Sequence, residues 1–141
     1  NFKIEANIGR DLRNRLKMKV LKTTGKSATT NVLLKEKFPL ISLVEFKLET
    51  GRTHQIRLHM EHNKTPIVGD QTYGLKPPSF FAKFNSTPEL KKALEQTKRQ
   101  MLHAFSLKFH HPFKNEEIIL EAPLPPDFQN LYNLLKPGKI E

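Results

Sequence analysis

The chain has 141 residues, no cysteine and a formal net charge of +10, with an ordinary share of hydrophobic residues. This length suits one domain with its own core, and the lack of cysteine excludes disulfides and thiolate metal sites. No apolar run in the sequence reaches the ~18–20 residues of a membrane-spanning helix, so we expect no membrane partner. The excess positive charge predicts an acidic partner, of which nucleic-acid phosphate is the commonest.

The basic residues cluster near the start of the chain. Between residues 10 and 26, seven arginines and lysines are accompanied by a single acid, Asp11. A clustered basic strip is better evidence for phosphate binding than a basic total. The expected phosphate contacts are Arg10, Arg13, Arg15 and Lys17; the alternative is a solvated basic surface.

Three strands are predicted in the first half of the chain. Residues 15–22 alternate apolar and basic side chains, and residues 28–38 are rich in β-branched residues and end at Pro39. Gly25 lies in the turn between them, where it can adopt a positive φ. Residues 40–49 give the clearest alternation, with Leu40, Val44, Phe46 and Leu48 on one face.

Helices and two further strands are predicted after this point. The segment "HQIRLHM" fits strand or helix spacing; we favour a helix capped by Thr53, because three strands in a row need a covering layer. A second helix is expected after a capping box formed by Ser86 and Glu89, with Pro88 in its first turn and Leu90, Ala93 and Leu94 inward.

Residues 102–109 and 116–123 predict two strands, interrupted at His111-Pro112. A last helix is expected after Pro125-Pro126, with Asp127 as its cap and Phe128, Leu131 and Leu135 inward. The predicted order is β-β-β-α-α-β-β-α. This order indicates an α+β fold, in which one mostly antiparallel or mixed sheet packs against helices.

Several common chemistries do not fit the sequence. His54, His59 and His62 are close together, but none of their spacings matches the i, i+4 pair of a zinc helix, and no acidic ligand accompanies them. The chain has no G-x-S-x-G elbow, and "VGDQTYG" lacks the Lys-Ser/Thr ending of a phosphate loop. We therefore expect neither a metal nor a cofactor.

Two longer motifs carry a resemblance. "TGRTHQIRLHM" followed by "GDQTYG" resembles the RluA-type family of RNA pseudouridine synthases, most closely its large-subunit ribosomal branch. "IGRDLRNRLKMKV", "GKSATT", "RQMLHAFSLKFHHP" and "EAPLPPDF" follow the same family order around this core, so the resemblance covers nearly the whole chain.

The resemblance implies a reaction and one catalytic residue. The family detaches uridine from its sugar at N1, rotates the base and rejoins it through C5, without metal or cofactor. It uses an aspartate, a tyrosine near the base and a basic residue paired with the aspartate. The paired residue is the arginine of "HQIR", which is Arg57 here. A guanidinium suits this role because it stays charged and holds a carboxylate through two hydrogen bonds.

The family aspartate lies in an H-R-L-D motif followed by T-S-G, which this sequence does not contain. Asp11 has the wrong motif order, and Asp70 and Asp127 lie in turn and cap contexts that favour structural roles. Neither Tyr73 nor Tyr132 corresponds to the family tyrosine. Residues 1–141 are therefore expected to be the C-terminal part of a catalytic domain whose upstream half carries the aspartate, and to be inactive alone.

Other residues are expected to support Arg57. The supporting set is Gly51 in a tight turn that allows close approach, Thr53 as a cap, His54 and Gln55 bracing Arg57 through backbone hydrogen bonds, and Leu102 as core behind the site. Ala104 is also expected in this core, with His103 as a polar neighbour. Arg52 is expected to bind either RNA phosphate or the neighbouring loop.

RNA is the expected partner and the cytoplasm the expected location. A fragment is also expected to self-associate through the face that its missing half would cover. The alternative function is a non-catalytic RNA-binding module on the same scaffold.

Overall fold

The computed structural model describes residues 1–75 and 87–136. The strands are β1 (Phe2–Glu5), β2 (Asn7–Arg10), β3 (Met18–Leu21), β4 (Thr29–Lys37), β5 (Ser42–Leu48), β6 (Ser106–His110) and β7 (Glu117–Glu121). The helices are α1 (Gln55–His62), α3 (Pro88–Gln96) and α4 (Pro126–Leu135). The fold is α+β, as predicted, and every strand pair is antiparallel. None of the helices in the described ranges is long and apolar enough to cross a membrane.

The strands form three sheets, so the prediction of a single sheet is wrong. One sheet has the order β1-β4-β5, and β2-β3 and β6-β7 are separate hairpins. The predicted strands over 15–22, 28–38 and 40–49 correspond to β3, β4 and β5. The short strands β1 and β2 were not predicted. They pair with β4 and β3, and Gly25, at φ 83°, lets the chain turn back so that Lys26 bridges to Ile8.

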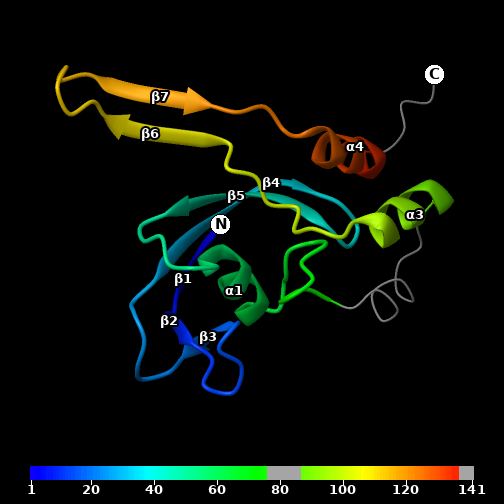
Figure 1. The fold of residues 1–141 in the computed structure, drawn as a ribbon. Helices are drawn as coiled ribbons and strands as arrows, with labels where there is room; N and C mark the ends of the chain where they lie inside the picture. The colour runs from blue at the N-terminus through cyan, green and yellow to red at the C-terminus, as the bar shows by residue number, and fades with distance from the viewer. Residues whose placement is uncertain (76–86, 137–141) are drawn as a thin grey trace.

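Helix α1 covers one face of the β1-β4-β5 sheet (Figure 1). Its Met60 packs with Ile4 and Val32 from the sheet, joined by the partly buried Val44 and Phe46. Its Leu58 packs into a second cluster with Ile8, Ala28 and Tyr73. The helix predicted at "HQIRLHM" is therefore confirmed. Through Met60 and Leu58 it packs against both the sheet and the β2-β3 hairpin.

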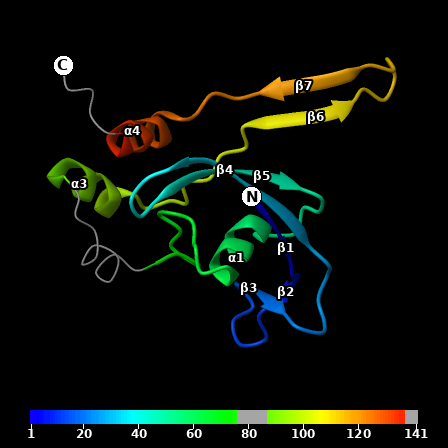
Figure 2. The ribbon, with the colours of Figure 1, turned by 180° about the vertical axis from the view of Figure 1, so that it is seen from behind.

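Helices α3 and α4 lie side by side beyond one end of the sheet (Figures 1 and 2). Leu90 and Leu94 of α3 pack against Leu131 of α4, with Leu135 partly buried beside them. This apolar spacing was predicted, but both predicted caps are wrong. The cap of α3 is Thr87, whose hydroxyl accepts from the Leu90 amide; Ser86 lies outside the described residues. Asp127 makes no cap bond, because its carboxylate binds Arg99.

The β6-β7 hairpin lies on the opposite side of the β1-β4-β5 sheet from α1 (Figures 1 and 2). Leu107 is paired with Leu120 and Phe109 with Ile118, so these four side chains share one face of the hairpin. Leu107, Phe109 and Leu120 are exposed. Ala104, just before β6, is also exposed, so the prediction that it is core is wrong.

Candidate active site

Arg57 lies on α1 between two residues whose side chains pack in the hydrophobic core. Ile56 and Leu58 pack into the two clusters beneath the sheet and the β2-β3 hairpin. Consecutive helical residues point in different directions, so Arg57 faces a third neighbour, the segment that follows α1. The helix begins after His54, whose φ is 55°.

Asp70 holds the Arg57 side chain. Nε of Arg57 donates to Oδ2 of Asp70 at 2.7 Å, and Nη2 donates to Oδ1 at 2.8 Å. The Asp70 side chain is 1% exposed and that of Arg57 is 13% exposed. The Asp70 carboxylate also accepts the amides of Thr72 and Tyr73 at 2.9 and 3.0 Å, which confirms its predicted place in a turn. The ion pair with Arg57 was not predicted.

Both charges of this pair are fixed. Burial raises the pKa of Asp70, but the hydrogen bonds from Arg57, Tyr73 and Thr72 outweigh it and hold that pKa below its usual value. The hydrogen bond to Asp70 raises the pKa of Arg57 further. The guanidinium is thus permanently charged and held in one orientation.

Tyr73 lies against the guanidinium. Cζ of Arg57 is 5.0 Å from the centre of the Tyr73 ring, within cation–π range. The Tyr73 hydroxyl accepts the Met18 amide at 3.0 Å and shares a 2.9 Å hydrogen bond with Nδ1 of His54. Burial, and then the positive charge of Arg57, lower the pKa of His54, so this ring is neutral at pH 7. The predicted bracing by His54 therefore runs through Tyr73 and not through the backbone.

One edge of the Arg57 guanidinium, its open edge, has no hydrogen-bond partner within the described residues. A guanidinium has five N–H groups, and Asp70 binds two of them. The other three have no hydrogen-bond partner among the described residues. This edge can bind a second carboxylate, a phosphate or a uracil oxygen.

Gln55 fastens the loop before α1 to strand β4. Its Oε1 accepts from the Thr50 hydroxyl at 2.7 Å and the Arg52 amide at 2.9 Å. Its Nε2 donates to the Thr29 carbonyl at 3.0 Å and the Thr30 hydroxyl at 2.9 Å. The predicted backbone hydrogen bonds of Gln55 are confirmed. Gln55 fixes where α1 begins, and it shows no direct bond to Arg57 within the described chain.

The predictions for Thr53 and Gly51 differ from the structure. The cap position of α1 is His54, whose side chain makes no cap hydrogen bond, so Thr53 is not the cap. A side-chain carbon placed at Gly51 would meet no described atom within 4 Å, so nothing in this part of the chain approaches it closely. Nor does Gly51 have the positive φ that would require glycine.

The segment after α3 carries two residues that were predicted near the site, Leu102 and His103. Leu102 is half-buried and belongs to none of the core clusters of the described chain. Nε2 of the neighbouring His103 donates to the Ala122 carbonyl at 3.0 Å. Tyr132, on α4, donates from its hydroxyl to Glu36 at 2.6 Å.

Both ring nitrogens of His59 are hydrogen-bonded within the protein. Its Nε2 donates to the Ala6 carbonyl at 2.9 Å, and its Nδ1 is 2.8 Å from the Thr30 hydroxyl. Burial lowers the pKa of His59, so the neutral ring accepts the Thr30 proton at Nδ1. With both nitrogens engaged, this histidine offers no ligand atom to a metal.

The predicted phosphate contacts fall into two groups. Arg10, Arg13 and Arg15 are exposed at the β2-β3 hairpin, with Lys17 half-buried beside them. Arg52 donates from Nε to the Ser27 carbonyl at 3.0 Å, so it binds the neighbouring loop.

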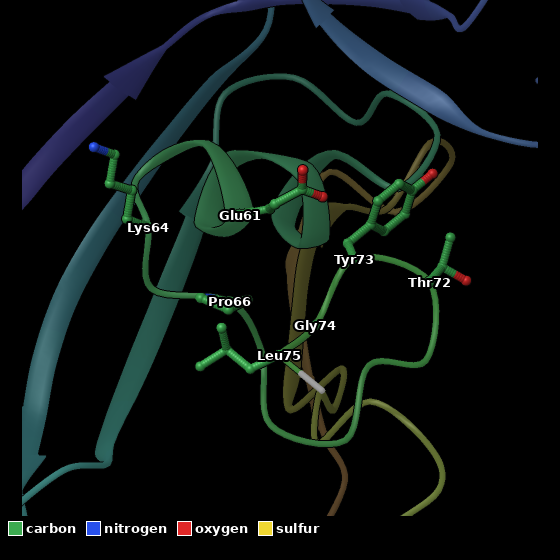
Figure 3. A pocket seen from close by; sticks show the side chains of 7 residues that line it. All are labelled: Glu61, Lys64, Pro66, Thr72, Tyr73, Gly74 and Leu75. Atoms are coloured by element: carbon green, nitrogen blue, oxygen red, sulfur yellow. The ribbon is translucent and has the colours of Figure 1, made fainter. Parts of the chain in front are cut away.

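A pocket of about 400 Å³ lies next to the site (Figure 3). It is lined by Glu61, Lys64, Pro66, Thr72, Tyr73, Gly74 and Leu75. The Tyr73 ring extends away from Pro66 and Leu75, and Arg57 is not among the lining residues (Figure 3). Tyr73 therefore lines the pocket and also lies against the Arg57 guanidinium.

Sequence reasoning missed two partners of Arg57, namely Asp70 and Tyr73. The local sequence pattern predicted a turn at Asp70 and no role for Tyr73. The available signal was the motif itself, because "GDQTYG" follows "HQIRLHM" closely enough to fold back on it.

Comparison with known proteins agrees with this geometry. Residues 1–62 match the family model described as RNA pseudouridylate synthase. The chain is 45% identical over 134 residues to the ribosomal large subunit pseudouridine synthase D of Neisseria meningitidis, covering 95% of this chain and 34% of the relative. It is 46% identical to the enzyme of the same name from Xanthomonas campestris, covering 94% of this chain and 39% of the relative.

A solved structure resembles the fold as well. Human RNA Pseudouridylate Synthase Domain Containing 1 superposes with a TM-score of 0.62 at 28% identity, over 86% of this chain and 47% of that chain. The chain thus spans between a third and a half of the length of the proteins it matches. Together, the family model, the relatives and the shared fold show that this chain is similar to RNA pseudouridine synthases over most of its length.

Proposed function

We propose that this chain forms the Arg57 wall of the active site of an RNA pseudouridine synthase that isomerises uridine in large-subunit ribosomal RNA. The observation that carries the proposal is the guanidinium of Arg57, fixed by two hydrogen bonds to Asp70 with its other edge open. The names of the bacterial relatives support ribosomal RNA as the substrate. A cytoplasmic location would follow from that substrate.

The open edge of Arg57 would bind the catalytic aspartate. That aspartate would come from a segment with the H-R-L-D motif, and residues 1–141 would form the C-terminal part of the catalytic domain. Paired with Arg57, the carboxylate stays ionised and able to attack the uridine or remove its proton. The proposed reaction uses no metal and no cofactor.

Asp70 is unsuited to be the attacking group. Its side chain is 1% exposed, and its oxygens already accept from Arg57 and from two backbone amides. A nucleophile must reach the substrate with a free lone pair. Asp70 is instead a positioning residue, which keeps the guanidinium in the orientation that the second carboxylate requires.

RNA contact would come from the basic β2-β3 hairpin. Arg10, Arg13 and Arg15 are exposed there, and the uridine must leave its base stack to reach a pocket. A non-catalytic RNA-binding module would use the same hairpin but would not need the open edge of Arg57.

A tritium-release assay distinguishes the two functions. RNA with 5-tritiated uridine releases tritium when C5 forms its new bond to the sugar. We expect no release from residues 1–141 alone, and release from a polypeptide that joins them to the H-R-L-D segment. RNA binding by the joined polypeptide without release would favour the binding module.

A further inference from the structure

The loop between β2 and β3 is ordered by its own hydrogen bonds. The Asp11 amide donates to the Lys17 carbonyl at 3.0 Å and closes the loop. Asn14 accepts the Leu16 amide at its side chain and the Lys17 amide at its carbonyl, at 3.1 and 2.9 Å. Asp11 accepts the Arg13 amide at 2.8 Å. The backbone from Asp11 to Lys17 is therefore folded before any partner binds.

Two leucines of this ordered loop point into solvent. Leu12 is 95% exposed and Leu16 is 90% exposed, whereas the leucines of the β4-β5 hairpin, Leu34 and Leu40, are each 50% exposed. Leu12 directly follows Asp11 and Leu16 directly precedes Lys17, so they occupy matching positions on the two sides of the closed loop. Exposed apolar side chains held on a folded loop mark a contact surface.

The charge of the Asp11–Lys17 loop indicates what kind of partner it binds. Arg13 and Arg15 lie between the two leucines and are exposed, and Arg10 donates across the loop to the Arg15 carbonyl at 3.0 Å. The one acid, Asp11, is occupied by the Arg13 amide. Alternating apolar and cationic side chains fit a partner that offers apolar planes between negative charges. Stacked bases between phosphates are such a partner.

We propose that Leu12 and Leu16 insert between bases of the RNA, while Arg13 and Arg15 bind the phosphates on either side. This inference rests on the proposed function and adds to it a means of unstacking the RNA. Insertion of an apolar wedge unstacks neighbouring bases, and a uridine must be unstacked before it can enter an active site.

The hairpin is also joined to the candidate active site. The Met18 amide, at the start of β3, donates to the Tyr73 hydroxyl, and the Tyr73 ring lies against Arg57. Unstacking by the loop would therefore occur at a fixed position relative to the guanidinium.

The test uses the 141-residue chain and a stem–loop RNA that carries 2-aminopurine in its loop, a base whose fluorescence rises on unstacking. We expect the wild-type chain to raise this fluorescence at saturation. The variant Leu12→Ala/Leu16→Ala should lose the rise and bind about tenfold more weakly, with the salt dependence of binding unchanged. Arg13→Ala/Arg15→Ala should keep the rise at saturation and reduce the slope of log K against log salt by about 1.5.

Leu34→Ala/Leu40→Ala is the matched control, because it removes two other exposed leucines from a hairpin. It should behave as wild type, with circular dichroism confirming that all variants fold. An unchanged fluorescence rise in Leu12→Ala/Leu16→Ala would overturn the wedge and leave the proposed function standing. The wedge would also be overturned, and the proposed function would stand, if these substitutions changed only the self-association of the chain, measured by sedimentation. Failure of the wild-type chain to bind the RNA at all would overturn the wedge together with the proposed RNA contact.

Discussion

Arg57 and Asp70 form a bidentate ion pair in which the carboxylate is buried and the guanidinium keeps one edge open. The chain contains a second pair with the same geometry, between Arg99 and Asp127, whose side chains are 44% and 54% exposed. The two pairs differ mainly in burial, which makes one a control for the other.

Asp70→Asn should lower the free energy of unfolding by about 2–4 kcal/mol, because it leaves a largely buried guanidinium without its counter-charge. Asp127→Asn should lower it much less, since water screens and replaces an exposed pair. Urea denaturation of both variants measures the difference. Equal losses would mean that the burial of Asp70 does not matter energetically.

Gln55→Leu should destabilise the chain by about 2–4 kcal/mol, because leucine leaves the part-buried Thr50 hydroxyl and Arg52 amide without their acceptor and removes the buried bond to Thr30. Gln71→Leu is the matched control, since its side chain is exposed and makes one bond to the Gly69 carbonyl. It should change stability by less than about 0.5 kcal/mol. A small effect at Gln55 would show that water replaces its partners.

Stability should fall as the pH decreases below about 6.5, the pKa of an unfolded histidine. Burial lowers the pKa of folded His59. The unfolded state therefore binds its proton first as the pH falls, and this favours unfolding until the folded pKa is passed. His59→Gln should reduce the pH dependence of thermal melts, leaving the part due to His54, whose pKa is also lowered.

The apolar face of the β6-β7 hairpin should make the isolated chain self-associate. Leu107 and Leu120 lie directly opposite each other on this exposed face. Sedimentation velocity should show a concentration-dependent increase in mass, which Leu107→Glu/Leu120→Lys should reduce. Lys108→Ala, on the opposite face, is the control. A wild-type chain that stays monomeric at all concentrations would contradict this.

Much of the fold was predictable because its elements have regular patterns. Alternation over 40–49 predicted β5, and β-branched content over 28–38 predicted β4. Helical spacing predicted α3 and α4, and the need for a layer that covers the strands favoured α1. Strands β1 and β2, of four residues each, were not predicted. The division into three sheets depends on pairing between distant segments, which no local pattern contains.

The site was predicted in its central residue but not in its contacts. The motif identified Arg57, yet its bonds to Asp70 and its contact with Tyr73 depend on the folding of the segment after α1 back onto that helix. The caps failed for a similar reason. Asp127 has a good capping side chain, but α4 begins after Pro125, so Asp127 lies within the first turn and its carboxylate binds Arg99.

The most direct measurement is the single-turnover rate of tritium release by the polypeptide that includes the H-R-L-D segment, with RNA binding followed in parallel. Arg57→Ala should abolish detectable release with RNA affinity nearly unchanged, because the loss falls on the chemical step. Arg57→Lys should recover little, since an ammonium cannot bind two carboxylates through parallel pairs of hydrogen bonds. Release at the wild-type rate by Arg57→Ala would contradict the role of this guanidinium in catalysis.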